Sequence, residues 1–251
     1  MKPTVGIVGL TGCAGDQLVI LNCERELLDL VELVDLRDFA MASSGADTEC
    51  ALDVAFVEGA VVTGEDEALL RRVRARARTL VSIGTCAMWG GVPAMPGRPR
   101  AEMMRAVYGE MEKPDALGDV RAVCDVVAVD AEIPGCPIEK EQFLQVLAGL
   151  LHGNLPLLPS YPLCTECRIR ENRCLLVADG ALCCGPVTVA GCGARCPSVG
   201  VACIGCRGPA HDANIPSVTH LFESNGHTRD EIEQRLNAFA SPAARARRGI
   251  R

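Results

Sequence analysis

Short apolar runs alternate with longer stretches of helical spacing over residues 1–153 of the chain. Aliphatic and β-branched runs predict strands at residues 4–9, 31–36, 54–62, 79–83 and 123–129. Apolar residues three and four positions apart predict helices at residues 17–30, 65–78, 100–112 and 139–151. Thr63 and Asp66 fit a capping box at the start of the second helix. Strands that alternate with helices in this way indicate an α/β domain whose parallel sheet is covered by helices on both faces.

The pattern changes at residue 154. Residues 154–213 have no regular periodicity, and nine of the 15 cysteines lie between residues 164 and 206. A segment with so little apolar packing needs cross-links, and bound metal is the natural one. Residues 214–251 return to helical character, and Thr228 with Glu231 fits a second capping box. We therefore predict a sheet domain at 1–153, a cysteine-rich segment at 154–213, and a C-terminal helix and tail at 214–251.

Composition narrows the possible functions. Hydrophobic residues make up 49% of the 251 residues, enough for a core, and the net charge is −7. The sequence has neither the basic patch nor the aromatic stacking residues that would indicate nucleic-acid binding. No apolar stretch approaches the roughly 18 residues that cross a bilayer. With no signal-peptide pattern at its start, the chain is predicted to be soluble and cytoplasmic, without a membrane span. A basic cluster near its end is interpreted as a solvated, frayed terminus: Arg245, Arg247, Arg248 and Arg251.

Fifteen cysteines favour metal binding, because thiols stay reduced in the cytosol and disulfides are rare there. Cys13, Cys86 and Cys136 each follow a predicted strand, in a loop that contains glycine, and Asp16 lies close to the first. The carboxyl ends of parallel strands converge on one crevice, so these residues are expected to meet at one site. The glycines let the backbone approach a bulky inorganic cluster.

Structural, non-ligating interpretations remain for several of these residues. Each of the three cysteines, taken alone, is compatible with a small buried hydrophobe. The glycines at 9, 12 and 15 lack the spacing of a dinucleotide-binding fingerprint. Cys50 and Cys124 lie outside any motif and are interpreted as ordinary thiols. The four histidines have no metal-like spacing and are interpreted as structural or exposed: His152, His211, His220 and His227.

The cysteine-rich segment has the spacing of a cluster-binding sequence. Cys164 and Cys167 form a C-x2-C pair that is followed by Cys174. From Cys192 the sequence reads C-x3-C-P-x5-C-x2-C and ends at Cys206. Cysteine sets of this kind, with a following proline, are similar to those that hold [4Fe–4S] clusters. Structural zinc uses four thiolates at comparable spacing and stays an alternative.

Taken in order, these motifs resemble the small subunit of [NiFe] hydrogenases. The resemblance is to the cytoplasmic branches, which include sulfhydrogenases and the methyl-viologen- and deazaflavin-reducing hydrogenases of methanogens. The matching motifs are LTGCAG at 10–15, GTCA at 84–87, GCP at 135–137, CTEC at 164–167, CGPVT at 184–188, GCGARCP at 191–197 and CIGCRGP at 203–209. The cluster-bearing subunit of complex I is a more distant relative that lacks the 164–206 segment.

The resemblance implies a flavodoxin-like domain with a proximal cluster, followed by a segment with a medial and a distal cluster, three [4Fe–4S] clusters in all. The implied proximal ligands are Cys13, Asp16, Cys86 and Cys136. The implied medial ligands are Cys192, Cys196, Cys203 and Cys206. The implied distal ligands are Cys164, Cys167, Cys174 and Cys184.

Two of these positions leave alternatives. Asp16 stands where the family has a fourth cysteine, and it either ligates iron through oxygen or leaves that iron to water or to another residue such as Cys23. Cys183 is adjacent to Cys184, and the Cys-Gly-Pro motif favours Cys184. The medial and distal sets could also exchange a ligand, as ferredoxin motifs do.

The resemblance implies an electron-transfer subunit with no catalytic residue of its own. Its expected partners are a large hydrogenase-type subunit and an electron-transfer subunit that contains flavin or iron–sulfur clusters. The alternative is the same kind of relay in a nickel-free, complex-I-like or electron-bifurcating oxidoreductase. A zinc-stapled interaction module is a third interpretation, and it predicts a colourless protein.

Overall fold

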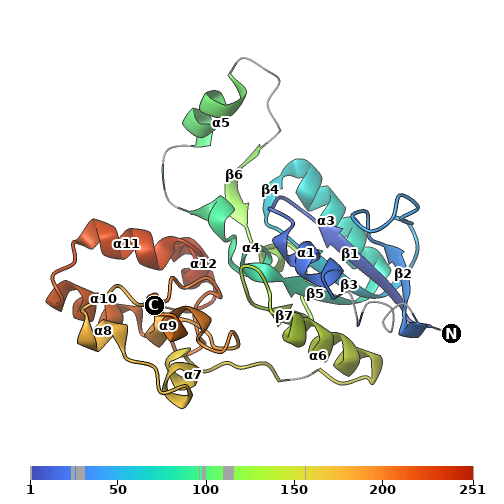
Figure 1. The fold of residues 1–251 in the computed structure, drawn as a ribbon. Helices are drawn as coiled ribbons and strands as arrows, with labels where there is room; N and C mark the ends of the chain where they lie inside the picture. Colours follow the sequence, from blue (N-terminus) through green and yellow to red (C-terminus); the bar gives the residue numbers. More distant parts are fainter. Residues whose placement is uncertain are drawn as a thin grey trace.

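The fold is described from a computed structural model covering residues 2–23, 26, 32–95, 97, 100–109, 116–155 and 157–250. Within these residues a five-stranded parallel sheet has the order β2-β1-β3-β5-β7. Its strands are β1 (Thr4–Gly9), β2 (Asp35–Asp38), β3 (Leu52–Glu58), β5 (Ala77–Ile83) and β7 (Ala131–Ile133). This is the strand order of flavodoxin-like domains, and it confirms the predicted α/β fold, with the cysteine-rich region following the sheet (Figure 1).

Both faces of the sheet are buried under helices. Along the central strand β3, Val54 and Phe56 pack into the core cluster under α1 (Gly15–Leu21) and α6 (Lys140–Leu151). The alternate residues Ala55 and Val57 pack into the cluster that includes Leu70 of α3 (Gly64–Arg76), on the opposite face. Side chains alternate between the two faces of a strand, so one continuous apolar run fills both layers.

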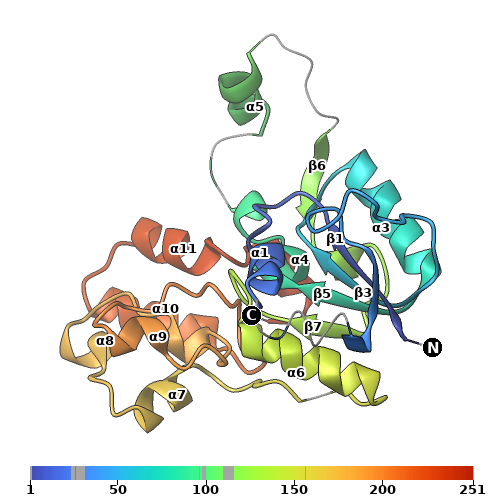
Figure 2. The same ribbon diagram turned by 45° about the vertical axis from the view of Figure 1, so that its right-hand side comes forward.

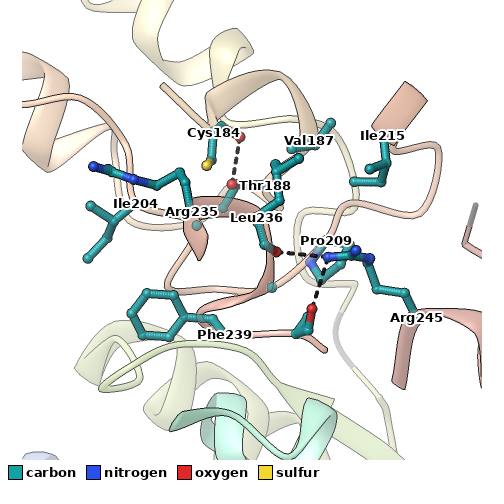
Figure 3. Close-up of a pocket in the computed structure, with 13 residues that line it drawn as sticks. Cys184, Val187, Thr188, Ile204, Pro209, Ile215, Arg235, Leu236, Phe239 and Arg245 are labelled. Atoms are coloured by element: carbon teal, nitrogen blue, oxygen red, sulfur yellow. Dashed lines mark hydrogen bonds between the residues drawn. The ribbon is translucent and has the colours of Figure 1, made fainter. Parts of the chain in front are cut away.

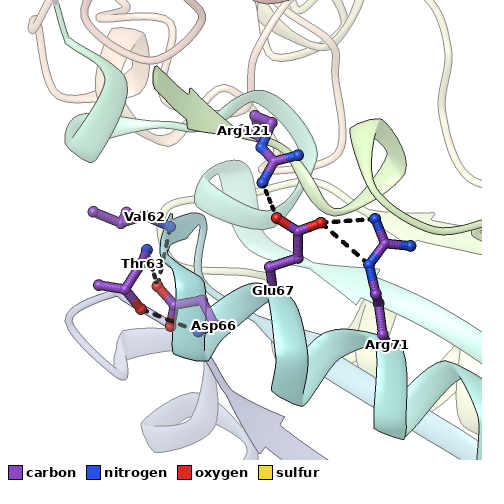
Figure 4. Close-up of polar contacts among 6 residues, drawn as sticks. All are labelled: Val62, Thr63, Asp66, Glu67, Arg71 and Arg121. Carbon is purple, nitrogen blue, oxygen red and sulfur yellow. Dashed lines mark hydrogen bonds and ion pairs between the residues drawn. The ribbon is translucent and has the colours of Figure 1, made fainter. Parts of the chain in front are cut away.

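The start of α3 is stabilised as its sequence predicts. The amide of Asp66 donates to Thr63 Oγ1 at 3.0 Å, and Asp66 Oδ2 accepts from the amides of Val62 and Thr63 (Figure 4). The next residue, Glu67, pairs with Arg71 at 2.7 Å and with Arg121 (Figure 4). Arg121 ends β6 (Ala116–Arg121), which pairs antiparallel with β4 (Val61–Thr63), so Glu67 ties this small second sheet to α3.

Several predicted boundaries differ from the structure. Residues 123–129 are not a strand: Val123–Asp125 form a 3-10 turn (η2), closed by the amide of Ala122 donating to Asp125 Oδ2 at 2.9 Å. The predicted strand 54–62 is interrupted at Gly59, whose φ of 92° turns the chain from β3 into β4. Helix α1 ends at Leu21, and the rest of the predicted helix 17–30 lies largely outside the described residues. The strand predicted at 31–36 begins at Asp35, and residue 31 lies outside the described residues. The helix predicted at 100–112 is α5, which ends at Tyr108; residues 110–112 also lie outside the described residues.

From residue 164 onward the described chain consists of short helices joined by loops (Figures 1 and 2). They are α7 (Cys164–Ile169), α8 (Leu175–Ala178), η3 (Gly185–Val187), α9 (Arg195–Ser198), α10 (Ile215–Ser224), α11 (Arg229–Asn237) and α12 (Pro242–Arg247). Leu163, Leu176, Phe222 and Ile232 form a separate core cluster with several of the cysteines. The predicted capping box of Thr228 begins α11. None of the helices in the described part of the chain has the length and apolar character to cross a bilayer.

The basic C-terminal cluster is docked on the protein, so the prediction of a solvated end is wrong for Arg245 and Arg248, whereas Arg247 is exposed. Arg245 is buried and donates to the carbonyl oxygens of Leu236 and Ala240 at 2.8 and 2.9 Å. Arg247 pairs with Asp125 at 2.9 Å. Arg248 lies 4.3 Å above the ring of Trp89 and pairs with Glu132 of β7. Arg251 lies outside the described residues.

The Arg248 contacts predict that this residue holds the C-terminal helix against the sheet. We expect Arg248→Ala to cost about 1–2 kcal/mol, because it removes a half-buried ion pair and a cation–π contact. Amides of α12 should then exchange roughly 5- to 30-fold faster with solvent deuterium in the assembled protein. Arg229→Ala is the matched control, since its pair with Glu233 is exposed at 3.6 Å. Equal exchange of α12 in both variants would contradict the docking role.

Candidate functional site

Three loops at the carboxyl edge of the sheet bring the N-terminal cysteines together. Cys13 follows β1, Cys86 lies in α4 (Gly84–Trp89) directly after β5, and Cys136 follows β7. The ionisable groups close enough to Cys136 to affect the charge of its thiol, here called its charge neighbours, are Cys86, Asp16, Cys13 and Glu58. The topology thus assembles the predicted proximal residues from segments more than a hundred residues apart, at the edge where α/β sheets bind ligands.

The charge neighbours of these thiols, within the described part of the chain, are other thiols and carboxylates. Burial, with a smaller contribution from these neighbours, raises the pKa of Cys86 and of Cys136 to about 11, and a hydrogen bond from the Val92 backbone opposes the rise at Cys86. Metal ligation requires thiolates, and a bound cation supplies the charge that makes them stable. Space is reserved around the sulfur atoms: a Cβ on Gly15 would lie 3.2 Å from Cys13 Sγ, and one on Gly91 2.7 Å from Cys86 Sγ. Donor type, charge and space therefore fit an iron–sulfur cluster.

Asp16 is buried beneath this group. Its Oδ1 accepts a hydrogen bond from the amide of Ile138 at 2.7 Å, which links the Cys13 loop to the Cys136 loop. Its Oδ2 lies against Gly84, where a Cβ would overlap the carboxylate. Burial raises the pKa of Asp16 to about 7, the Ile138 amide opposes this rise, and the charge of Glu58 adds to it. Asp16 therefore lies at the site as a buried carboxyl group whose charged form a nearby cation would stabilise.

Glu58 is a residue of the site that the sequence motifs do not reveal. It ends the central strand β3, is 3% exposed, and accepts hydrogen bonds from the amides of Asp16 and Gln17 at 3.1 and 3.3 Å. Its Oε2 also accepts from Gln17 Nε2 at 2.8 Å. A carboxylate at the first turn of a helix is favoured by the helix dipole. Glu58 thereby holds α1, and with it Asp16, over the end of the sheet.

Four cysteines of the C-terminal half surround one small apolar cavity: Cys164, Cys167, Cys174 and Cys183. Burial raises the pKa of Cys164 to about 11, and its charge neighbours are Cys183, Cys167 and Cys174. A Cβ on Gly185 would lie 3.3 Å from Cys164 Sγ and 3.6 Å from Cys183 Sγ. The structure thus brings three predicted distal residues together with Cys183, the neighbour of the predicted Cys184.

Cys184 lines a different cavity from its neighbour. Figure 3 shows its side chain near Thr188, Ile204 and Arg235, and the hydroxyl of Thr188 donates to the Cys184 carbonyl at 2.7 Å. Burial raises the pKa of this thiol to about 12. Of the two adjacent cysteines, Cys183 is therefore the one that lines the cavity of Cys164, Cys167 and Cys174.

The medial residues divide into two arrangements. Cys206 has Cys192, Cys136 and Cys196 as its charge neighbours, and burial raises its pKa to about 11. Cys203 is oriented differently: its thiol donates to Thr188 Oγ1 at 3.7 Å, and its charge neighbours are Cys184 and Cys183. The Cys206 thiol therefore lies near Cys192, Cys196 and proximal Cys136, while Cys203 lies on the side of Cys183 and Cys184.

Short contacts join the three groups. The Thr85 hydroxyl, one residue before Cys86, lies 2.9 Å from the carbonyl oxygen of Gly135 and 2.5 Å from that of Cys206. It connects both proximal loops to the medial loop. At the other end, the amide of Cys203 donates to Cys183 Sγ at 3.3 Å. The cysteine groups thus form one contiguous series through the protein.

The remaining thiols and histidines lie outside this series. Cys23 is fully buried in the sheet core, and its thiol donates to the carbonyl oxygen of Val19 at 3.4 Å. Cys50 donates to the carbonyl of Asp47, and Cys124 accepts from Arg248. His211 contacts Asp212, and His227 contacts the carbonyl of Gly180. In the described part of the chain, no three histidine, cysteine or acidic side chains are arranged to hold a single metal ion.

Two known proteins are similar to almost the whole chain. Sulfhydrogenase 2 subunit delta of Pyrococcus furiosus is 40% identical over 236 residues, which cover 94% of this chain and 98% of the relative. A subunit of the F420-non-reducing hydrogenase of Methanocaldococcus jannaschii is 30% identical over 276 aligned residues, covering 96% of this chain and 95% of the relative. Both alignments include the cysteine-rich segment as well as the sheet domain.

A family model and solved structures agree with these relatives. The model described as NADH ubiquinone oxidoreductase, 20 Kd subunit, matches residues 13–150. An NAD+-reducing [NiFe]-hydrogenase in the H2-reduced state contains a chain that is 28% identical, with a TM-score of 0.58, covering 63% of this chain and 96% of that one. A chain of the Ni-Fe-Se hydrogenase from Desulfomicrobium baculatum shares the fold at 19% identity, with a TM-score of 0.58 over 88% of this chain and 99% of that one.

Proposed function

We propose that this chain carries electrons through three [4Fe–4S] clusters. The chain belongs to the family of small subunits of [NiFe] hydrogenases, and electron transfer is its role as such a subunit. Electrons would enter from a large subunit that holds the nickel–iron centre. They would leave to an acceptor subunit that contains flavin or further clusters. The chain would thus serve a hydrogenase complex as its conductor, while the chemistry of hydrogen takes place in the large subunit.

The observation that carries this proposal is the contiguous series of cysteine groups. The series begins at exposed Cys13, beside the sheet, and ends at exposed Cys174, in the C-terminal half. Between these ends the thiols of Cys136 and Cys206 are charge neighbours, and Cys203 contacts Cys183. A conductor needs a buried interior with an accessible terminus at each end, and this arrangement supplies both.

We assign the ligands of each cluster from these groups. The proximal ligands are Cys13, Cys86 and Cys136, with Asp16 in the fourth position. The medial ligands are Cys192, Cys196 and Cys206, which lie together, with Cys203 included on the strength of the C-x2-C motif that it forms with Cys206. The distal ligands are Cys164, Cys167, Cys174 and Cys183, with Cys183 replacing Cys184 in the set suggested by the motif. Bound clusters supply one-electron redox centres whose potential depends on ligand type, charge and hydrogen bonds.

The protein contributes position and environment to this transfer. The strand ends and the Thr85 hydroxyl hold the proximal and medial loops against each other. Apolar residues such as Leu163 and Leu176 line the distal cavity and keep water away from the sulfur atoms. Backbone amides reach the sulfur atoms of Cys183 and Cys203, with the Gly205 amide 3.4 Å from Cys203 Sγ. Such hydrogen bonds orient the ligands and adjust their basicity.

We expect Cys136→Ser to abolish electron flow, because Cys136 belongs to the proximal group and also neighbours Cys206 of the next one. Hydrogen-dependent reduction of an added acceptor dye by the assembled complex should fall to the level of complexes that lack this chain. Cys50→Ser is the matched control, since Cys50 lies outside the cysteine series. Undiminished dye reduction by the Cys136→Ser complex would exclude the proposed conduction path.

The orientation of the adjacent cysteines predicts different outcomes for two neighbouring substitutions. Cys183→Ser should remove the distal cluster, so the complex should contain about four fewer iron atoms than the unmodified one. Cys184→Ser should leave the iron content unchanged, because this thiol faces the Thr188 cavity. Iron and acid-labile sulfide analysis of both purified complexes compares them directly. Loss of iron only from the Cys184→Ser complex would restore the assignment favoured by the motif.

Asp16 is proposed as an oxygen ligand of the proximal cluster, since its buried carboxyl group adjoins Cys86 and Cys136. Asp16→Cys should keep the cluster and change its electron paramagnetic resonance (EPR) spectrum and midpoint potential, because thiolate replaces carboxylate. Asp16→Asn retains the side-chain shape and the acceptor for the Ile138 amide but weakens ligation. If both variants reproduce the unmodified proximal spectrum, Asp16 is not a ligand.

A further inference from the structure

Arg207 is the largest of the fully buried side chains in the described part of the protein. It directly follows Cys206 in the medial loop and is 1% exposed. A guanidinium group stays charged inside a protein, and its burial is costly unless an anion balances it. Most buried arginines therefore pair with a carboxylate.

No carboxylate pairs with Arg207 among the described residues. Its Nε donates to the carbonyl oxygen of Ala190 at 3.0 Å, and its Nη2 donates to Gln142 Oε1 at 2.8 Å. Both acceptors are neutral. Its Nη1 is buried and has no hydrogen-bond partner in that part of the chain. One donor and one full positive charge are thus left without a partner among these residues.

The two nearest acidic side chains are committed to other groups. Glu139 pairs with Arg195 at 2.6 Å. Glu166 accepts hydrogen bonds from the amides of Gly191 and Ala194 at 2.9 and 3.3 Å. The remaining charge neighbours of Arg207 are the thiols of Cys192 and Cys206. Within the described ranges, the anions left to balance the guanidinium are therefore the medial thiolates.

The neighbouring backbone leaves room for the guanidinium in this position. Gly191, directly before Cys192, has a φ of 121°, and a Cβ there would overlap both Arg207 and Gln142. Gln142 itself is buried on α6, so the guanidinium is held between the sheet domain and the medial loop. The orientation of Arg207 is therefore fixed by two separate segments, helix α6 through Gln142 and the medial loop through Gly191.

We propose that Arg207 is a positioning residue for the medial cluster, balancing its negative charge and donating Nη1–H to its sulfur atoms; this inference rests on the function proposed above. Each electron that the cluster accepts adds negative charge beside Arg207. A positive charge in a low-dielectric interior stabilises that reduced form more than the oxidised form. Arg207 therefore raises the reduction potential of the medial cluster and favours transfer of electrons from the proximal one.

The test is an EPR-monitored redox titration of the whole complex, purified without air. Cys196→Ser identifies the medial signal as the one that it removes or alters. Arg207→Gln removes the charge, and Arg207→Lys keeps it while losing the planar fork. Arg195→Gln is the matched control, because Arg195 also adjoins a medial cysteine but its side chain is 72% exposed.

We expect Arg207→Gln to lower the medial midpoint potential by more than Arg195→Gln does, with Arg207→Lys lying nearer the unmodified value. Loss of the medial signal in Arg207→Gln, with retention in Arg207→Lys, would equally support a counter-charge. A midpoint in Arg207→Gln equal to that of Arg195→Gln would overturn the proposal, as would equal effects of Gln and Lys, which would indicate a role of shape alone. An unmodified complex without iron–sulfur signals would instead refute the proposed function.

Discussion

Negative charge on buried sulfur is the constraint on which the rest of this structure depends. The chain gathers thiols at places where burial raises the pKa of Cys86, Cys136, Cys164 and Cys206 to about 11. Without a cation these groups stay protonated, and each is a polar group in an apolar interior. In the proposed function, iron would supply the missing positive charge, so the bound clusters would be both the conductor and the cross-links of a segment with little core of its own.

The sheet topology determines where this chemistry takes place. Parallel strands place the loops after β1, β5 and β7 at one edge, and Glu58 at the end of β3 holds α1 above them. The Thr85 hydroxyl then joins this edge to the carbonyl of Cys206. The C-terminal segment also contacts this region, because Arg248 pairs with Glu132 in β7, the strand that leads to Cys136. Position along the conduction path is thus set by backbone and by buried polar contacts.

Much of this was predictable from the sequence, because the main signals are local. Apolar runs and capping residues identified the longer helices of the sheet domain and most strands, and strand ends identified Cys13 and Cys86 as neighbours. Cys136 does join them, but it follows β7 and not the predicted strand 123–129. The orientation of Cys183 was not predictable, since it depends on which side of one peptide faces the cavity. The docking of Arg245 and Arg248 was not predictable either: a basic C-terminal run is usually solvated, and only the tertiary positions of Trp89 and Glu132 give it partners. The roles of Glu58 and Arg207 were not predictable from the sequence either, because they depend on the burial of these side chains in the folded protein.

The most direct test of the central claim is metal and acid-labile sulfide analysis of the complex isolated without air through a tag on this chain. We predict iron and sulfide in comparable amounts, together with nickel in the copurifying large subunit. Iron and sulfide without nickel would keep the electron carrier but assign it to a nickel-free, complex-I-like or electron-bifurcating oxidoreductase. Zinc without sulfide would contradict the account, because the cysteine groups would then be structural sites that carry no electrons.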